Sequence, residues 1–198
     1  MVSSKNKSIF SWIIVIALFA LVLGTFAPLL FDGEFFEKQP TVQNKEIAIY
    51  FNNNQFDPNF SDCGKTYPVF RIINDSVNLP EAALKELFKG PTEQEKEQGY
   101  VSWFSPQTEF ILKNLKIENN TVYVDLIDIR SIIPNASSSC GSAEFLSEIE
   151  NTLKQFPEIE KIIFAINEKP SDFYEWIQVG CDKQLNNCDE KPFVDFNK

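Results

Sequence analysis

The stretch that decides the fold is LPEAALKELFKGPTEQEKEQGYVSWF, residues 79–104. Its first half predicts an amphipathic helix, because four apolar residues recur at helical spacing and form one stripe. These four residues are Ala83, Leu84, Leu87 and Phe88. Asn78 can cap the start of this helix. Gly90 and Pro91 predict its end, since glycine adopts the left-handed conformation of a helix cap and proline cannot continue the helix.

A second, shorter helix is predicted immediately afterwards. Thr92 with Glu95 matches a capping box, and Gly99 closes the turn before the chain becomes extended again. Neither helix carries an obvious catalytic group. The stretch therefore favours a packing and binding role over an enzyme.

Composition and charge exclude several classes of function. The chain has 198 residues, which allows one domain with appendages, and 43% of them are hydrophobic, which is enough for a core. Its formal net charge of −10 repels phosphate backbones, so nucleic acid is not an expected partner. Histidine, the commonest general base and zinc ligand, is absent from the sequence. We therefore expect no enzyme, no bound metal and no cofactor.

The N-terminal region predicts a membrane anchor. Residues 8–31 contain no charged residue, and their length can cross a bilayer as a helix. Lys5 and Lys7 precede this segment and acidic residues follow it, so the positive-inside rule keeps the N-terminus cytoplasmic and places the rest outside. The alternative is a cleaved signal peptide, although a small-x-small cleavage site is poorly formed.

The anchor makes the chain a single-pass protein of the cell membrane with an extracytoplasmic domain. The predicted parts are a cytoplasmic tail at 1–8, a transmembrane helix at 9–31, a linker at 32–45, a domain at 46–180 and a C-terminal tail at 181–198.

The domain predicts alternating strands and helices. The longest helix is expected at 141–156, where apolar residues recur every three or four positions. Asn119-Asn120 separates two alternating runs and predicts a β-hairpin, because asparagine tolerates the positive φ of such a turn. Strands are expected at 46–52, 66–74, 108–118, 121–128, 159–167 and, at an edge, 173–179. The predicted fold class is α/β (α+β): a single two-layer sandwich of one mixed sheet with helices on one face.

Four cysteines lie on the side predicted to be exported. An even number in an oxidising compartment favours disulfides, and three connectivities are possible. We favour Cys63–Cys140, which ties the loop after the first strand to the longest helix, together with Cys181–Cys188. A metal or redox site is the alternative, but the sequence has no CxxC spacing.

Aromatic residues after the second helix are the candidate partner-binding residues. Tyr100, Trp103 and Phe104, followed by Phe110, predict a cluster that either packs in the core or forms a partner-binding patch.

Other polar groups are weaker candidates for chemistry. Asp125 and Asp128 are expected to be solvated or capping carboxylates on opposite faces. The serine run 137–139 has no nearby base, and the oxygen-rich loop at 52–62 matches no EF-hand spacing.

Three runs resemble the GerMN domain of bacterial sporulation and spore-germination proteins. They are EAALKELFKGPTEQEKEQGY from Glu81, TEFILKNLKIENNTVYVDL from Thr108 and ENTLKQFPEIEKIIFAI from Glu150. The resemblance covers about residues 46–170, and three motifs are specific in combination: the Gly90-Pro91-Thr92 signature with Glu95, the VYVDL strand and the TL-QFP hinge. It implies a compact α/β fold akin to the ring-building domains of envelope assembly machines, and a role in holding envelope complexes together. The family has no catalytic residues to carry over.

Three hypotheses about function follow. The first is a membrane-tethered, non-catalytic binding or scaffold module in a bacterial cell-envelope complex, whose partner is an envelope protein or a second copy. The second is a ligand-binding module for cell-wall fragments that uses the aromatic residues. The third is an enzyme acting on peptidoglycan, which without histidine would need a carboxylate pair in a cleft.

Overall fold

The computed structural model describes residues 44–59, 61–74 and 78–194, which belong to one compact unit, Val42–Lys198. Within these described residues, no helix combines the length and the apolar character that crossing a membrane requires. The predicted cytoplasmic tail and transmembrane helix, 1–31, lie outside the described residues.

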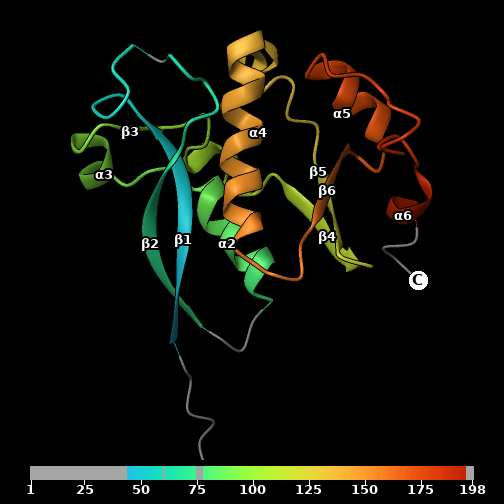
Figure 1. The fold of residues 1–198 in the computed structure, drawn as a ribbon, viewed down its shortest axis with the longest axis horizontal. Helices are drawn as coiled ribbons and strands as arrows, with labels where there is room; N and C mark the ends of the chain where they lie inside the picture. The colour runs from blue at the N-terminus through green and yellow to red at the C-terminus, as the bar shows by residue number, and fades with distance from the viewer. Residues whose placement is uncertain (1–43, 60, 75–77, 195–198) are drawn as a thin grey trace, which may run out of the picture. The chain divides into compact units, whose positions relative to one another are not determined.

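The domain contains two three-stranded sheets (Figure 1). The first is antiparallel with the order β2-β1-β3, and its strands are β1 Asn44–Asn53, β2 Tyr67–Asn74 and β3 Tyr100–Val101. The second has the order β4-β5-β6, and its strands are β4 Leu112–Glu118, β5 Thr121–Leu126 and β6 Lys161–Ile166. This second sheet is mixed, since β5 pairs antiparallel with β4 and parallel with β6. The prediction of one sheet is therefore wrong.

Side chains of the longest helix and of its C-cap residue, Gln155, occupy the part of the β1 edge that the short strand β3 does not cover. The helix α4 spans Ser139–Lys154. Along the edge of β1, the N–H of Ala48 donates to Gln155 Oε1 at 3.0 Å, that of Tyr50 to Thr152 Oγ1 at 3.1 Å and that of Asn52 to Glu148 Oε1 at 3.3 Å. Gln155 Nε2 returns a hydrogen bond to Ala48 O at 2.7 Å. Side chains thus replace a neighbouring strand along most of this edge.

The edge of β6 is occupied in a similar way. The N–H of Phe164 donates to the hydroxyl of Tyr174 at 3.2 Å, and that of Ile166 to Lys169 O at 3.2 Å. Because these edge groups already have hydrogen-bond partners, neither β1 nor β6 is free to pair with a further strand there.

The remaining helices pack around this framework, and aromatic rings join the halves of the core. The helices are α2 Leu79–Phe88, α3 Glu93–Glu97, α5 Pro170–Trp176 and α6 Lys191–Val194, with 3₁₀ turns at Pro106–Thr108 and Pro134–Ser137. Neighbouring ring centroids lie 4.9, 5.4, 6.1 and 4.7 Å apart along the series Phe88, Phe104, Phe145, Phe173 and Phe164. One continuous core therefore serves both sheets.

The stretch 79–104 folds as predicted. The side chain of Asn78 accepts a hydrogen bond from the N–H of Glu81, and Thr92 and Glu95 form a complete capping box. Gly90 has φ +73°, and a Cβ there would lie 2.2 Å from the carbonyl oxygen of Phe104. The hairpin is confirmed as well, with φ values of 49° and 60° at Asn119 and Asn120.

The last predicted strand, 173–179, is wrong, because most of it belongs to α5. Pro170 occupies the first turn of that helix. Phe173, Tyr174 and Ile177 are buried at positions i, i+1 and i+4, which is a helical rather than an alternating pattern.

The C-terminal segment is packed onto the domain through residue 194. Cys181 is joined to Cys188, and α6 follows. Phe193 is fully buried, with its ring edge-on to Tyr123 at 5.6 Å. The expectation of a separate polar tail at 181–198 missed this anchor residue.

Candidate partner-binding surface

The outer face of the first sheet exposes apolar side chains on an edge strand. Phe70 is 60% exposed and Ile72 is 72% exposed. Val69, whose side chain lies on the opposite face of β2, is only 8% exposed. The register places Ala48 opposite Phe70 and Tyr50 opposite Pro68, so β1 continues the same face with two half-buried residues. We call this set of five residues the β2 outer face: Ala48, Tyr50, Pro68, Phe70 and Ile72.

The strand β2 also has a free edge. It pairs with β1 on one side and with no other strand among the described residues. An unpaired edge offers backbone N–H and C=O groups to another chain, and proteins commonly guard such edges with outward charges, bulges or proline. Pro68 protects part of β2, and two carbonyls of this edge already have partners within the domain: that of Pro68 accepts from the hydroxyl of Tyr100 at 3.3 Å and that of Phe70 from Arg71 Nη1 at 3.5 Å. The single charged side chain of β2, Arg71, is also turned to a partner within the domain.

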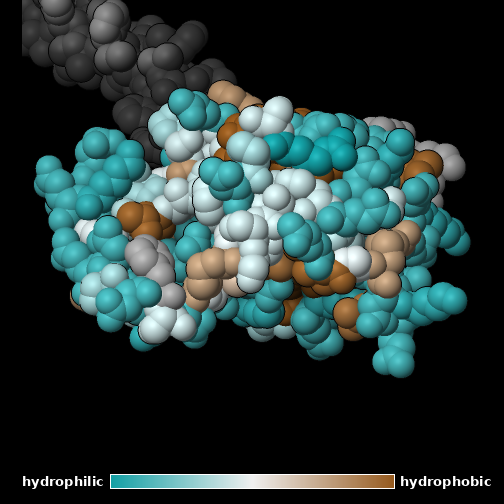
Figure 2. Space-filling model, turned by 90° about the horizontal axis from the view of Figure 1, so that it is seen from above, coloured by the Kyte–Doolittle hydropathy of each residue, from teal (hydrophilic) through white to brown (hydrophobic). Residues whose placement is uncertain are grey.

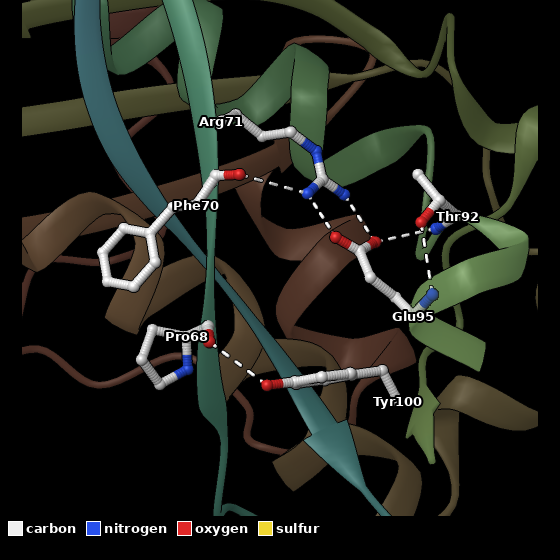
Figure 3. A network of polar contacts seen from close by, with 6 residues as sticks. All are labelled: Pro68, Phe70, Arg71, Thr92, Glu95 and Tyr100. Carbon is white, nitrogen blue, oxygen red and sulfur yellow. Dashed lines mark hydrogen bonds and ion pairs between the residues drawn. The ribbon is translucent and has the colours of Figure 1, made fainter. Parts of the chain in front are cut away.

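A polar network lies beside β2 and connects it to α3 and to Tyr100 of β3 (Figure 3). The guanidinium of Arg71 forms a two-pronged ion pair with Glu95 of α3, with 2.6 Å between Nη2 and Oε2. Glu95 also accepts the N–H of Thr92 at 2.8 Å, and the hydroxyl of Tyr100 donates to Pro68 O at 3.3 Å. In Figure 3 the ring of Phe70 points away from this network. The strand is thus fixed by α3 and β3 while its apolar side chains stay exposed.

The ion pair in this network is largely shielded from water, with 17% of the Arg71 side chain and 13% of the Glu95 side chain exposed. Burial by itself raises the pKa of Glu95. The hydrogen bonds from Arg71 and Thr92, together with the positive charge of Arg71, outweigh burial and hold the pKa below its ordinary value. Glu95 therefore stays ionised and keeps the clamp closed at neutral pH.

Comparison with known families identifies the domain. Residues 48–172 match the Germane family model, described as sporulation and spore germination. The chain belongs to this family. The resemblance to the GerMN domain seen in the sequence is thereby confirmed.

A solved structure and the curated proteins were compared as well. The chain is similar to the tandem GerMN domains of the sporulation protein GerM from Bacillus subtilis, with 22% identity and a TM-score of 0.45. That match covers 65% of this chain and 40% of the GerM chain, so this chain spans less than half the length of that relative. No curated protein matches.

The Germane domain separates the four aromatic residues that the sequence grouped together. Tyr100 belongs to the network behind β2, and Phe104 is 2% exposed between Phe88 and Phe145. Burial removes Phe104 from any partner-binding surface. Trp103 is half-buried beside α4, whereas Phe110 is 80% exposed next to a hollow of about 460 Å³ between α2 and β4.

The cysteines pair as the sequence favoured. Cys63 is joined to Cys140 and Cys181 to Cys188, with Cα separations of 5.4 and 5.6 Å. The first pair ties the loop after β1 to the first turn of α4. The second closes a short loop before α6.

Asp125 and Asp128 differ from each other in burial. Asp128 is exposed and pairs with Arg130 at 2.7 Å. Asp125 is fully buried, accepts the N–H of Glu168 at 2.7 Å and lies 3.5 Å from Lys113 Nζ. Of the two expected roles, solvated or capping, the first is wrong for Asp125 and the second fits, because the turn after β6 folds over this carboxyl and donates a backbone N–H to it.

The remaining polar candidates serve local structure. Ser138 caps α4 by accepting the N–H of Gly141 at 3.1 Å. Asn53 Oδ1 accepts the N–H groups of Gln55 and Phe56 within its own loop. These contacts give both segments a structural role.

Sequence reasoning missed two features of the molecule. The exposed pair Phe70 and Ile72 could have been found, since VFRII is apolar on both faces and Pro68 already indicated an edge strand. The polar series Glu148, Thr152 and Gln155 recurs at helical spacing beside the apolar stripe of α4, but nothing local indicates that it caps a strand.

Proposed function

We propose that the protein is a membrane-tethered, non-catalytic binding module of the bacterial cell envelope that docks a partner protein on the β2 outer face. The observation that carries this proposal is the exposure of Phe70 and Ile72 on an eight-residue strand that lies at the edge of its sheet. Such an edge binds an extended segment by adding a strand, while the exposed side chains supply apolar contact.

The partner is an envelope protein presenting an extended, apolar segment without excess negative charge. The chain carries a net charge of −10, which disfavours a second copy of itself and favours a neutral or basic segment. The network of Arg71, Glu95 and Tyr100 keeps β2 in place before binding, which lowers the entropy lost on docking.

The extracytoplasmic location rests on three supports. The sequence predicts an anchor at 9–31, membership of the Germane family fits an envelope role, and both cysteine pairs suit an oxidising compartment. A reporter enzyme that is active only outside the cytoplasm, fused to the C-terminus, tests this location. Activity is expected, and a reporter active only inside the cytoplasm would overturn it.

Photocrosslinking in living cells tests the docking surface. A photoreactive phenylalanine replaces Phe70 in one strain and Phe110 in another, because both residues are exposed phenylalanines on different elements. A discrete adduct to an envelope protein is expected at position 70 and not at position 110. Equal adducts at both positions, adducts at 110 alone, or an adduct to a second copy of the chain would each contradict the proposal.

An exchange of Ile72 for lysine provides an independent measurement. A charge on the free edge opposes strand addition and leaves the core untouched, since Ile72 is 72% exposed. The adduct at position 70 should fall at least about tenfold in I72K, while the melting temperature changes little.

A further inference from the structure

A small hollow lies away from β2, where β1, β3 and α4 meet. Its volume is about 200 Å³, and it is lined by Asn52, Val101, Ser102, Trp103 and Glu144. In Figure 1 the end of β1, β3 and the start of α4 all lie at the upper end of the domain. Figure 2 looks onto this end and shows a mostly hydrophilic surface with small, separate hydrophobic patches. The lining of the hollow combines the apolar surfaces of Val101 and Trp103 with the polar side chains of Asn52, Ser102 and Glu144.

The first of these groups is the amide of Asn52, which is 3% exposed. Its Nδ2 donates to Cys63 O at 3.1 Å and to Lys65 O at 2.9 Å, which fixes the orientation of the amide. Its Oδ1 is buried and has no hydrogen-bond partner. A buried acceptor without a donor is rare in proteins and indicates a missing partner.

The second group is the carboxyl of Glu144, which is half-buried and belongs to none of the ion pairs in the described residues. Its Oε1 lies 3.8 Å from the sulfur of Cys140, but that sulfur is bonded to Cys63 and has no proton to donate. The indole N–H of Trp103 faces the carboxyl but does not form a well-aligned hydrogen bond with it. Burial raises the pKa of Glu144, and the indole offsets only part of this effect.

A second carboxyl lies one helical turn further along α4. Glu148 is fully buried and accepts hydrogen bonds from Ser102 Oγ at 2.5 Å and from the N–H of Asn52. Burial, and to a lesser extent the charge of Glu144, raises the pKa of Glu148 well above its ordinary value. The hollow thus holds two acceptors without a hydrogen-bonded donor, Asn52 Oδ1 and the carboxyl of Glu144, beside a single unpartnered donor, the indole N–H of Trp103.

We propose that this hollow binds an alkylammonium group, which donates to Glu144 and to Asn52 Oδ1 while its methylenes pack against Val101 and the indole of Trp103. An ammonium carries three donors and no acceptor, which matches the unfilled acceptors. An anion would be repelled by Glu144. A sugar would bring acceptors of its own, for which the lining offers little beyond one indole N–H.

The size of the hollow restricts the ligand further. About 200 Å³ is below the roughly 300–1,000 Å³ typical of sites for drug-sized ligands, so the site takes a single amine-terminated chain. A free alkylamine and the end of a lysine side chain on a partner share this chemistry.

Nuclear magnetic resonance on the full chain tests the proposal. n-Butylamine and Nα-acetyl-lysine amide are titrated separately while the indole N–H resonances are recorded. The resonance of Trp103 should shift saturably with at least one ligand, whereas that of Trp176, which packs in the core against Phe145, serves as an internal reference. Stronger binding of the lysine derivative indicates a partner's side chain, and stronger binding of butylamine indicates a free amine.

Matched variants complete the test. Glu144→Gln should weaken binding at least about tenfold, because it removes the charged acceptor. Glu150→Gln removes one charge from the same helix, where it pairs with Lys154, and should change binding less than about twofold. An unshifted Trp103 resonance, equal binding of the Nε-acetylated lysine derivative, equal effects of the two variants, or binding of glucose in place of the amines would overturn the proposal. An unchanged Trp176 resonance verifies that each variant is folded.

Discussion

The replacement of Glu148 by alanine tests whether α4 stabilises the domain by capping β1. Glu148 is 0% exposed, and its carboxyl accepts hydrogen bonds from the backbone of Asn52 and from the hydroxyl of Ser102. Alanine would leave a buried N–H without an acceptor and open a cavity. A buried donor left without a partner costs about 1–3 kcal/mol. With the cavity added, we expect a loss of about 2–4 kcal/mol.

Thermal unfolding followed by circular dichroism measures this loss. For a domain of about 150 residues each kcal/mol corresponds to roughly 2–4 °C, so the melting temperature should fall by about 5–15 °C. Glu150→Ala is the matched control, because it removes a glutamate from the same helix that makes an exposed i, i+4 pair with Lys154. That pair contributes about 0.3–0.5 kcal/mol.

The comparison can refute the reasoning directly. If Glu148→Ala and Glu150→Ala lower the melting temperature by the same small amount, the cap on β1 contributes nothing to stability. Glu148→Gln adds a second check, since it retains an acceptor for Asn52 and should keep most of the stability.

Three further predictions concern pH, glycine and the disulfides. Burial raises the pKa of Glu148 in the folded state well above its ordinary value of 4.5, so the folded protein binds a proton at this carboxyl more tightly than the unfolded chain does. Stability should therefore fall as the pH rises from the unfolded pKa towards the folded pKa. Urea unfolding of the wild type should show this fall as the pH rises above 4.5, with a smaller fall in Glu148→Gln, and identical profiles would contradict the prediction. Gly90→Ala should lower stability by at least about 2 kcal/mol more than Gly180→Ala, since both sites have positive φ but only Gly90 has a neighbour within 4 Å; equal losses would refute the close contact. Replacing both cysteines of one pair by serine should lower stability by about 4.5 kcal/mol for Cys63–Cys140 and by about 2.4 kcal/mol for Cys181–Cys188, because the chain-entropy cost grows with the sequence separations of 77 and 7 residues. Denaturant unfolding measures both losses, and a larger loss for Cys181–Cys188 would contradict the prediction.

Local features of this fold could be predicted because a few neighbouring residues determine them. The cap at Asn78, the glycine at the end of α2, the capping box and the Asn119-Asn120 turn each depend on positions within about five residues. The same holds for the core stripes of α2 and α4, which follow from helical periodicity.

Features that depend on distant contacts could not be predicted in the same way. The division into two sheets depends on hydrogen bonds between β1 and α4 across sequence separations of 96 to 107 residues. The run 173–179 was too short to separate a strand from a helix by pattern, and packing against Phe145 and Phe164 decides in favour of the helix. The candidate surface is different, because the run VFRII, apolar on both faces, and Pro68 already indicated an edge strand with an uncovered apolar face.

The strand edges of the two sheets differ in how they are protected, and this difference favours one docking site. The edge of β1 beside α4 and the edge of β6 are capped by side chains and a turn. The edge strand β4 carries Lys113, Lys116 and Glu118 and has a register shift near its start, which are devices that oppose the addition of a strand. The edge of β2 has a proline, two carbonyls with partners inside the domain and two exposed apolar side chains instead. A partner that binds by strand addition therefore meets least resistance at β2, and lysine at position 72 would give this edge the kind of protection that β4 already has.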